Sequence, residues 1–186
     1  MSATKEYPQR HAISSDEYVR MGEAGVFAPG ARLELMDGEI VEMAPIGSAH
    51  AAVVNALSTL LSRSLLDCIV SMQNPLVLDD LTVPQPDISV LKNRDDKYFR
   101  AHPRPADALL VVEVADSTLR FDLEAKVPLY ARAGVRETWV VDIEKRAIHV
   151  CRELVADRYL TCTQYAGHQI IEFQGITVRV SDLFPL

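Results

Sequence analysis

Alternating apolar and polar residues form the first clear pattern in the chain, in the segment RLELMDGEIVEM at positions 32–43. Two short runs flank Asp37-Gly38, and an Asp-Gly pair in this setting is a strong signal for a tight β-hairpin. The segment from Ser48 to about Leu66 repeats its apolar residues at the spacing of one helix face: Val53, Val54, Leu57, Leu60, Leu61 and Leu65. The pattern therefore predicts a hairpin followed by an amphipathic helix.

Short apolar runs at 69–72, 87–91 and 138–143 predict further strands. The run ALLVVEV at 108–114 is apolar on both faces, which is typical of a central strand that is covered on both sides. Three or four more short strands are expected between 147 and 180. Together these elements predict an α/β fold, in which a mixed sheet core flanked by helices carries an N-terminal β-hairpin and a C-terminal antiparallel extension.

A second helix is expected from Asp122 to about Ala133, because Gly134 supplies a usual helix end. Pro128 lies beyond the first turn of this helix and should kink it, since proline has no amide hydrogen to donate.

The chain of 186 residues suits one domain with one core. We expect residues 1–31 to form a peripheral segment with a short helix near 15–21, residues 32–150 the core, and residues 151–186 a β tail. Hydrophobic residues make up 48% and charged residues 24%, which is ordinary for a globular protein. No segment reaches the ~18 apolar residues that a membrane span needs.

The first residues, MSATKEYPQR, lack the apolar run of a secretory signal, so we expect a cytoplasmic protein. Cys68, Cys151 and Cys162 are odd in number and widely spaced. They are therefore expected to be reduced thiols, neither a disulfide framework nor a zinc site.

Net charge limits the choice of partner. The 19 Lys and Arg residues stand against 26 Asp and Glu residues, a balance of -7, which does not favour whole-protein attraction to nucleic acid. A local basic groove or a bound divalent ion would be needed to offset it. The sequence has no G-x-G-x-x-G, Walker A, G-x-S-x-G or H-E-x-x-H motif, so no nucleotide cofactor and no zinc hydrolase site is expected.

Two carboxylates interrupt apolar strands. Asp87 follows Pro86 at the start of PDISVL, and Glu113 stands inside LLVVEVA. A buried carboxylate is costly unless it is paired or bound to metal, and a lone one could simply be satisfied by a basic side chain or a backbone amide. Two on neighbouring core strands instead favour a site for Mg²⁺ or Mn²⁺, which prefer hard oxygen ligands.

Several ordered segments resemble one known family. LELMDGEIVEMAPIGSAHAAVVNAL, PQPDISVL and EVADSTLRFDLEAKVPLYARAGVRETWVVD are similar to the Uma2 family of restriction-endonuclease-like proteins, within the PD-(D/E)xK nuclease superfamily. The similarity covers roughly residues 30–150. It implies the restriction-endonuclease-like fold and a Mg²⁺-dependent (or Mn²⁺-dependent) endonuclease that hydrolyses DNA phosphodiester bonds. Asp87, Glu113 and the main-chain carbonyl of Val114 would then bind one or two metal ions.

The lysine of the superfamily pattern is displaced in this chain. Strand alternation would put it two residues after Glu113, where Ala115 stands. The family resemblance implies that Lys126, on the following helix, takes the catalytic place. The alternative is a surface ion pair with Asp122 at i,i+4, worth only about 0.3 to 0.5 kcal/mol.

Three further residues are secondary candidates for the site. Glu34 on the hairpin could add a metal ligand, although an exposed hairpin charge is the alternative. His50, at the start of the long helix, could contact phosphate or a metal-bound water, or it could donate to a backbone carbonyl. Tyr130 lies one turn beyond Lys126 and could support it, or it could only pack.

Three functions remain open after these considerations. The first is an active endonuclease, the second is a nuclease-fold binding or interaction module with little catalysis, and the third is a structural protein. The trio Asp87, Glu113 and Lys126 argues against the third, because an idle site has no reason to keep three charges near a core. A homodimer is expected, built with the β tail or the hairpin, because nucleases that cut both strands commonly pair their sites about a two-fold axis.

Overall fold

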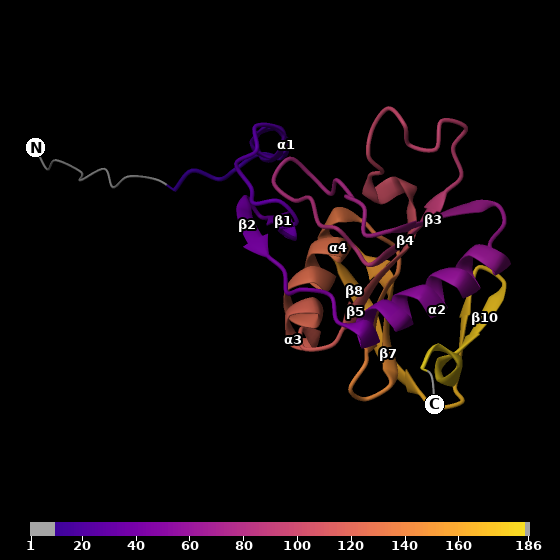
Figure 1. Ribbon diagram of the computed structural model, residues 1–186. Helices are drawn as coiled ribbons and strands as arrows, with labels where there is room; N and C mark the ends of the chain where they lie inside the picture. The colour runs from indigo at the N-terminus through magenta and orange to yellow at the C-terminus, as the bar shows by residue number, and fades with distance from the viewer. Residues whose placement is uncertain (1–9, 185–186) are drawn as a thin grey trace, which may run out of the picture.

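A computed structural model of the protein describes residues 10–184, and Figure 1 shows how its elements are arranged. The predicted hairpin is present as strands β1 (Leu33–Met36) and β2 (Glu39–Glu42). Asp37 and Gly38 have φ angles of 49° and 80°, as a two-residue hairpin turn with two left-handed positions requires. The expected N-terminal helix is α1 (Ser15–Glu23). Residues 1–9 of the predicted peripheral segment lie outside the described residues.

A six-stranded sheet forms the centre of the domain, in the order β3-β4-β5-β6-β7-β8. Its strands are β3 (Cys68–Met72), β4 (Ile88–Lys92), β5 (Ala108–Ala115), β6 (Thr138–Asp142), β7 (Ala147–Val155) and β8 (Arg158–Ala166). Strands β5 and β6 pair in parallel and the other neighbours pair antiparallel, so the sheet is mixed as expected. Strands β9 (Ile170–Phe173) and β10 (Ile176–Arg179) form a separate C-terminal hairpin.

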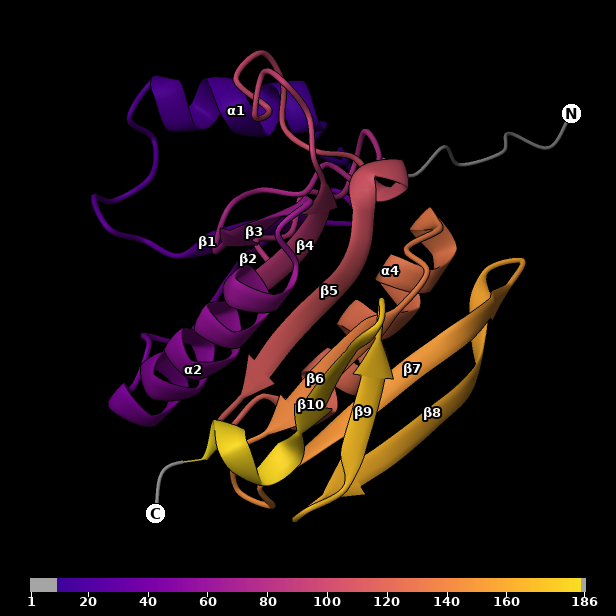
Figure 2. The ribbon, with the colours of Figure 1, turned by 90° about the vertical axis from the view of Figure 1, so that its right-hand side faces the viewer.

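The two faces of the sheet are covered by different elements (Figure 2). Helix α2 (Ser48–Ser64) and the C-terminal hairpin pack on one face, where Leu110, Val112 and Val114 of β5 point. The intervening residues of β5 point to the other face, because strand side chains alternate. There Val111 packs with Leu129 and Tyr130 of the second helical segment. Glu113 therefore points toward that helical segment.

The second helical segment begins earlier than predicted and contains a wide turn. It runs through α3 (Leu119–Phe121), a π turn (Asp122–Lys126) and α4 (Val127–Ala133). Pro128 lies in the first turn of α4 and has no backbone N–H to donate. The helix accommodates the missing hydrogen bond because the wider π turn comes immediately before α4. Gly134 ends α4 at φ 92°, as predicted.

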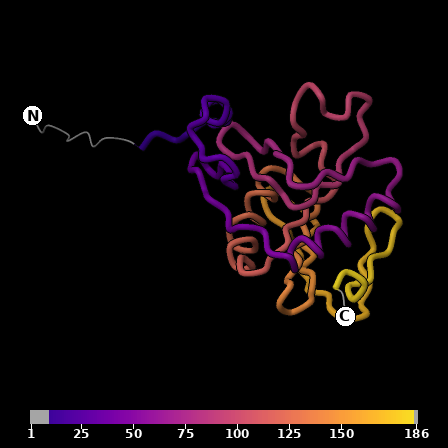
Figure 3. Tube along the Cα trace, in the orientation of Figure 1, coloured from indigo at the N-terminus to yellow at the C-terminus, as the bar shows by residue number. Residues whose placement is uncertain are grey.

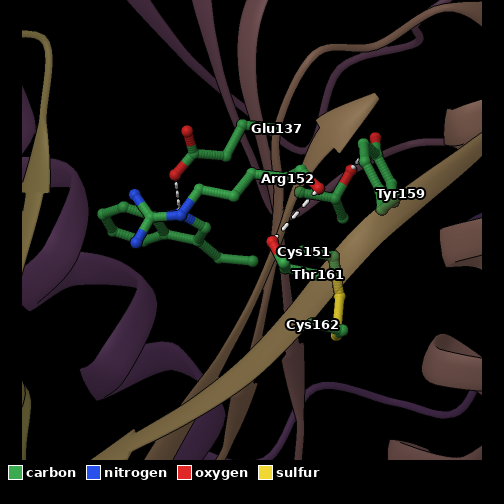
Figure 4. The surroundings of a disulfide bond; sticks show 8 residues. Glu137, Cys151, Arg152, Tyr159, Thr161 and Cys162 are labelled. Atoms are coloured by element: carbon green, nitrogen blue, oxygen red, sulfur yellow. Dashed lines mark hydrogen bonds between the residues drawn. A yellow bond between two sulfur atoms is a disulfide. The ribbon is translucent and has the colours of Figure 1, made fainter. Parts of the chain in front are cut away.

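The prediction of three reduced cysteines was wrong for two of them. Cys151 and Cys162 form a disulfide bond between β7 and β8 (Figure 4), and Cys68 is free. The two residues are direct partners in the β7–β8 register. Their separation of 11 residues does not reveal this, because the hairpin register depends on where the turn falls.

Long connections join some of the strands. Residues 93–107, between β4 and β5, stand out from the body of the domain (Figure 3) and include a short 3-10 turn at Pro105–Asp107. A second 3-10 turn, Val180–Leu183, follows β10. Within residues 10–184, no helix is long and apolar enough to cross a membrane.

The packing of α2 on the sheet gives a stability prediction. Leu57 is fully buried in the larger core cluster, so Leu57→Ala is expected to lower the free energy of unfolding by about 2 to 5 kcal/mol, through lost burial and the cavity left behind. Urea unfolding followed by circular dichroism measures this. Leu66→Ala is the matched control, because Leu66 is 82% exposed, and it should change the free energy by less than about 0.5 kcal/mol. Equal effects of the two substitutions would contradict the assigned packing.

Candidate active site

Asp87, immediately before β4, and Glu113, on the neighbouring strand β5, lie next to each other. The β4–β5 register pairs Ile88 with Val112, and one step further it brings Asp87 opposite Glu113. Both side chains are buried, with 5% and 3% of their surface exposed. The apolar strands hold two carboxylates where the sequence predicted them, and their proximity demands compensating groups.

Hydrogen bonds compensate the Asp87 carboxylate. Its Oδ2 accepts from His50 Nε2 at 3.0 Å and from the Val114 amide at 2.8 Å, and its Oδ1 accepts from Gln73 Nε2 at 3.3 Å. Burial raises the pKa of Asp87, but the hydrogen bonds and the His50 ring outweigh it, so the pKa lies below its usual value. Asp87 is therefore held as a carboxylate.

Lys126 provides the charge that faces Glu113. Its Nζ lies 3.2 Å from Glu113 Oε1 and 3.0 Å from the carboxylate of Glu34. Tyr130 donates a further hydrogen bond to the same oxygen of Glu113. The π turn and α4 position Lys126 and Tyr130 over the sheet, while β1 supplies Glu34.

The Lys126 ammonium group contacts two buried carboxyl groups, those of Glu34 and Glu113. Burial lowers the pKa of Lys126, but the charges of Glu113 and Glu34 raise it more, so Lys126 stays protonated. Burial also raises the pKa of Glu113 well above its usual value, and the nearby charges of Asp87 and Glu34 add to the effect. We conclude that the cluster keeps its lysine charged and makes full ionisation of Glu113 costly without another cation.

The alternative role considered for Lys126, a pair on the helix surface, does not fit its position, because only 2% of the residue is exposed. Asp122 is buried nearby but accepts its hydrogen bond from Thr118 Oγ1 at 2.7 Å. Burial raises the pKa of Asp122. Asp122 thus adds a further carboxyl group at the same place.

These side chains line a cavity of about 70 Å³, which opens on one side to solvent. Its walls include all the predicted side chains except Tyr130, which lies behind Glu113: Glu34, His50, Asp87, Glu113 and Lys126. The structure therefore brings together residues that are up to 92 positions apart in the sequence.

Sequence reasoning missed several residues of the cavity. Asp122 was considered only as a surface partner, and Gln73, Thr118, Asp116 and Arg32 were not considered; of these five, all but Gln73 line the cavity. Polar residues in loops or at helix ends are common, so no pattern in the sequence distinguished them. Asp122 gave the best signal, because it lies one turn before Lys126 on a segment that faces the sheet.

The donor atoms fit a hard divalent cation. Asp87, Glu113 and the Val114 carbonyl offer oxygen ligands, and Mg²⁺ commonly binds one or two carboxylates while it keeps several waters. Glu34 Oε2 is a buried oxygen that lies 3.0 Å from Lys126 Nζ and accepts no well-aligned hydrogen bond from the described residues. Among residues 10–184, no three His, Cys, Asp or Glu side chains are gathered closely enough to hold a metal ion by themselves. Water and main-chain oxygen would complete the coordination.

A solved structure shares this architecture. The protein from Anabaena variabilis ATCC 29413 described as "a putative nuclease belonging to DUF820" superposes with a TM-score of 0.70. The alignment covers 92% of this chain and 97% of that chain, at 12% sequence identity. It confirms the predicted fold, because a likeness at this identity reports on the backbone. No curated protein matches the chain.

The family comparison covers nearly the whole domain. The model of the Uma2 family, described as "Putative restriction endonuclease", matches residues 15–181. This range includes the hairpin, the six-stranded sheet and each residue of the cavity described above. The match extends beyond residues 30–150, the part of the sequence that resembles the family by its motifs. The chain belongs to the Uma2 family.

Proposed function

We propose that this protein is a metal-dependent endonuclease that hydrolyses DNA phosphodiester bonds with Asp87, Glu113 and Lys126. The observation that carries the proposal is the position of Lys126, whose Nζ lies 3.2 Å from Glu113 although Ala115 occupies the usual place of the lysine. A buried ammonium beside two adjacent carboxylates is the set of groups that metal-assisted phosphodiester hydrolysis uses. Membership of a nuclease-like family supports the same reading.

Asp87, Glu113 and the Val114 carbonyl would hold one or two Mg²⁺ or Mn²⁺ ions. When bound, the metal would supply a Lewis acid that lowers the pKa of water and neutralises charge on the phosphate. His50, Gln73 and the Val114 amide fix the Asp87 carboxylate from three sides. This preorganisation orients the Asp87 carboxylate at the cavity before a metal ion binds.

Lys126 would orient the attacking water and stabilise negative charge on the phosphate. Glu34 and Glu113 anchor its Nζ from two directions, so the ammonium is held in place before substrate arrives. Such fixed charges are effective because they need no reorganisation during the reaction. Tyr130 remains a neutral donor, because burial and the charge of Glu113 raise its pKa well above the usual value, and it positions the Glu113 carboxyl group.

The acidic balance of the chain is compatible with this proposal. The cavity collects carboxyl groups around one lysine and one arginine, Lys126 and Arg32, so a divalent cation would be attracted before a phosphate could be. DNA binding would then depend on the bound ion and on local contacts. We propose that the enzyme acts on DNA as a homodimer.

A binding module with little catalysis is the second candidate. Ala115 and the acidic cavity favour it, because a site without the usual lysine and with carboxyl groups at its mouth could have lost turnover. The two candidates differ in turnover, since only the first predicts hydrolysis of DNA, whereas the second acts by binding nucleic acid or another partner.

Plasmid cleavage separates the two. Wild-type protein with Mg²⁺ or Mn²⁺ is expected to nick supercoiled DNA and to stop when EDTA is added. Asp87→Asn and Lys126→Met should each lower the rate by at least about 100-fold, a size typical for the loss of one electrostatic catalytic group. Gel electrophoresis of matched preparations measures the rates. Asp142→Asn is the control, because Asp142 is equally buried but lies outside the cavity, and it should retain activity.

Circular dichroism must show that each variant is folded, since breaking a buried ion pair can cost about 3 to 5 kcal/mol. Lys126→Arg keeps the charge and serves if Lys126→Met does not fold; it should also be slow, because the guanidinium cannot occupy the same point. A folded wild type that leaves DNA intact with either metal would contradict the endonuclease proposal and favour the binding module.

Metal binding gives an independent measurement. Because Mn²⁺ would bind the folded protein and not the unfolded chain, it should raise the melting temperature, with a gain of about 2.7 kcal/mol at a hundredfold excess over the dissociation constant. Asp87→Asn should abolish the shift measured by differential scanning fluorimetry, and Asp142→Asn should preserve it. An equal shift in wild type and Asp87→Asn would refute the assigned ligand.

A further inference from the structure

Strand β8 (Arg158–Ala166) is the last strand of the central sheet and has an open outer edge. It pairs with β7 on one side, and Figure 2 shows it beyond β7 at the border of the molecule. In the part of the chain that the structure describes, no other strand pairs with β8. Its outward amide and carbonyl groups therefore form a nine-residue template for another strand.

The composition of β8 lacks the usual protection of an open edge. Proteins commonly place lysine, proline or other charges on such strands to prevent pairing between molecules. After Arg158, the strand reads YLTCTQYA, without a charged residue, a proline or a glycine. Leu160 is 57% exposed, and Val155 at the adjoining end of β7 is 52% exposed. Tyrosine and threonine also favour strands, so this edge is well suited to pairing.

The sequence of β8 is nearly symmetric about Cys162. Thr161 and Thr163 flank it at one residue, and Tyr159 and Tyr165 flank it at three residues. In an antiparallel pair of identical strands centred on Cys162, each residue faces the one at the same distance on the other side. Thr161 would face the partner's Thr163, and threonine pairs are among the favourable cross-strand contacts. The tyrosines add no such pair, because Tyr159 packs on the α4 face, where its hydroxyl donates to the Val135 carbonyl at 2.7 Å, and Tyr165 packs on the α2 face.

We infer that two copies of this chain associate through β8, antiparallel and about a two-fold axis at Cys162. The six-stranded sheet of each copy then continues into that of the other, and each contact occurs twice, as a two-fold interface requires. This inference does not depend on the proposed catalysis. It names the segment that forms the expected homodimer, and it would place two cavities in one assembly.

Charge permits a second copy to pair at this edge. Two molecules of net charge -7 repel each other, so they can approach most easily where charges are few. The eight residues 159–166 carry none, and the single charge of the strand, Arg158, would face the partner's Ala166 and meet no like charge. The opposite edge strand, β3 (Cys68–Met72), is shorter, at five residues, and follows Asp67.

Paired charge substitutions test this register directly. T161K/T163K puts Lys opposite Lys at both symmetric contacts, and T161E/T163E puts Glu opposite Glu. T161K/T163E and T161E/T163K each put Lys opposite Glu. Analytical ultracentrifugation of the full chain at micromolar concentration should show a wild-type dimer. The like-charge variants should raise the dissociation constant by on the order of tenfold to a hundredfold, and the opposite-charge variants should restore the dimer.

The set controls for net charge, because the two disruptive variants change it in opposite directions and the two restoring variants leave it unchanged. Thr163 is exposed and Thr161 makes only a 3.4 Å bond to the Arg152 carbonyl (Figure 4), so the fold should survive; thermal melts verify it. A wild-type monomer would overturn the inference. Equal dimerisation of all four variants, or loss of the dimer in all four, would overturn the β8 register.

Cross-linking at the axis is the second measurement. Cys151→Ala frees Cys162 from its intramolecular disulfide, and the two Cys162 side chains would then lie opposite each other, within reach of a disulfide bond. Oxidation with diamide should give a covalent dimer on a non-reducing gel. Cys151→Ala/Cys162→Ser keeps Cys68 and should give none. A covalent dimer in both variants, or in neither, would count against the axis at Cys162.

Discussion

The ion pair between Lys126 and the two carboxylates of Glu113 and Glu34 is the constraint on which the candidate site depends. It links the central strand β5, the hairpin strand β1 and the π turn before α4, at distances of 3.0 and 3.2 Å. A buried charge of this kind is tolerated only with partners, since its desolvation costs several kcal/mol. The three elements must therefore meet correctly for any of these groups to be buried.

The interaction also sets the chemical character of the cavity. Asp87, supported by three hydrogen bonds, stays ionised, whereas burial makes the ionisation of Glu113 costly. Adjacent carboxyl groups with opposite pKa shifts commonly mark functional sites. A divalent cation would relieve the imbalance, because it would supply the charge that one lysine cannot. The electrostatics of the cluster and its proposed metal chemistry thus have the same cause.

The central sheet positions both the candidate site and the proposed dimer contact. Its buried centre, β4 to β6, holds the carboxylates in a fixed register, because a slip by one residue would turn Glu113 to the opposite face. Among residues 10–184, its outer strand β8 pairs only with β7, and its nearly symmetric sequence, uncharged after Arg158, suits a second copy. A rigid core and a self-complementary edge are compatible in one sheet, because each strand pairs only with its neighbours.

The sequence by itself determined the order of elements, the hairpin turn at Asp37-Gly38 and the burial of Asp87 and Glu113, because periodicity and turn chemistry are local. It also singled out Lys126, but only through resemblance to a family, since spacing alone favoured a surface pair with Asp122. Only the tertiary structure decided that Lys126 is buried between Glu34 and Glu113, that His50 holds Asp87, and that Cys151 meets Cys162. These contacts join distant segments, and their geometry depends on strand register and helix placement that no local pattern encodes.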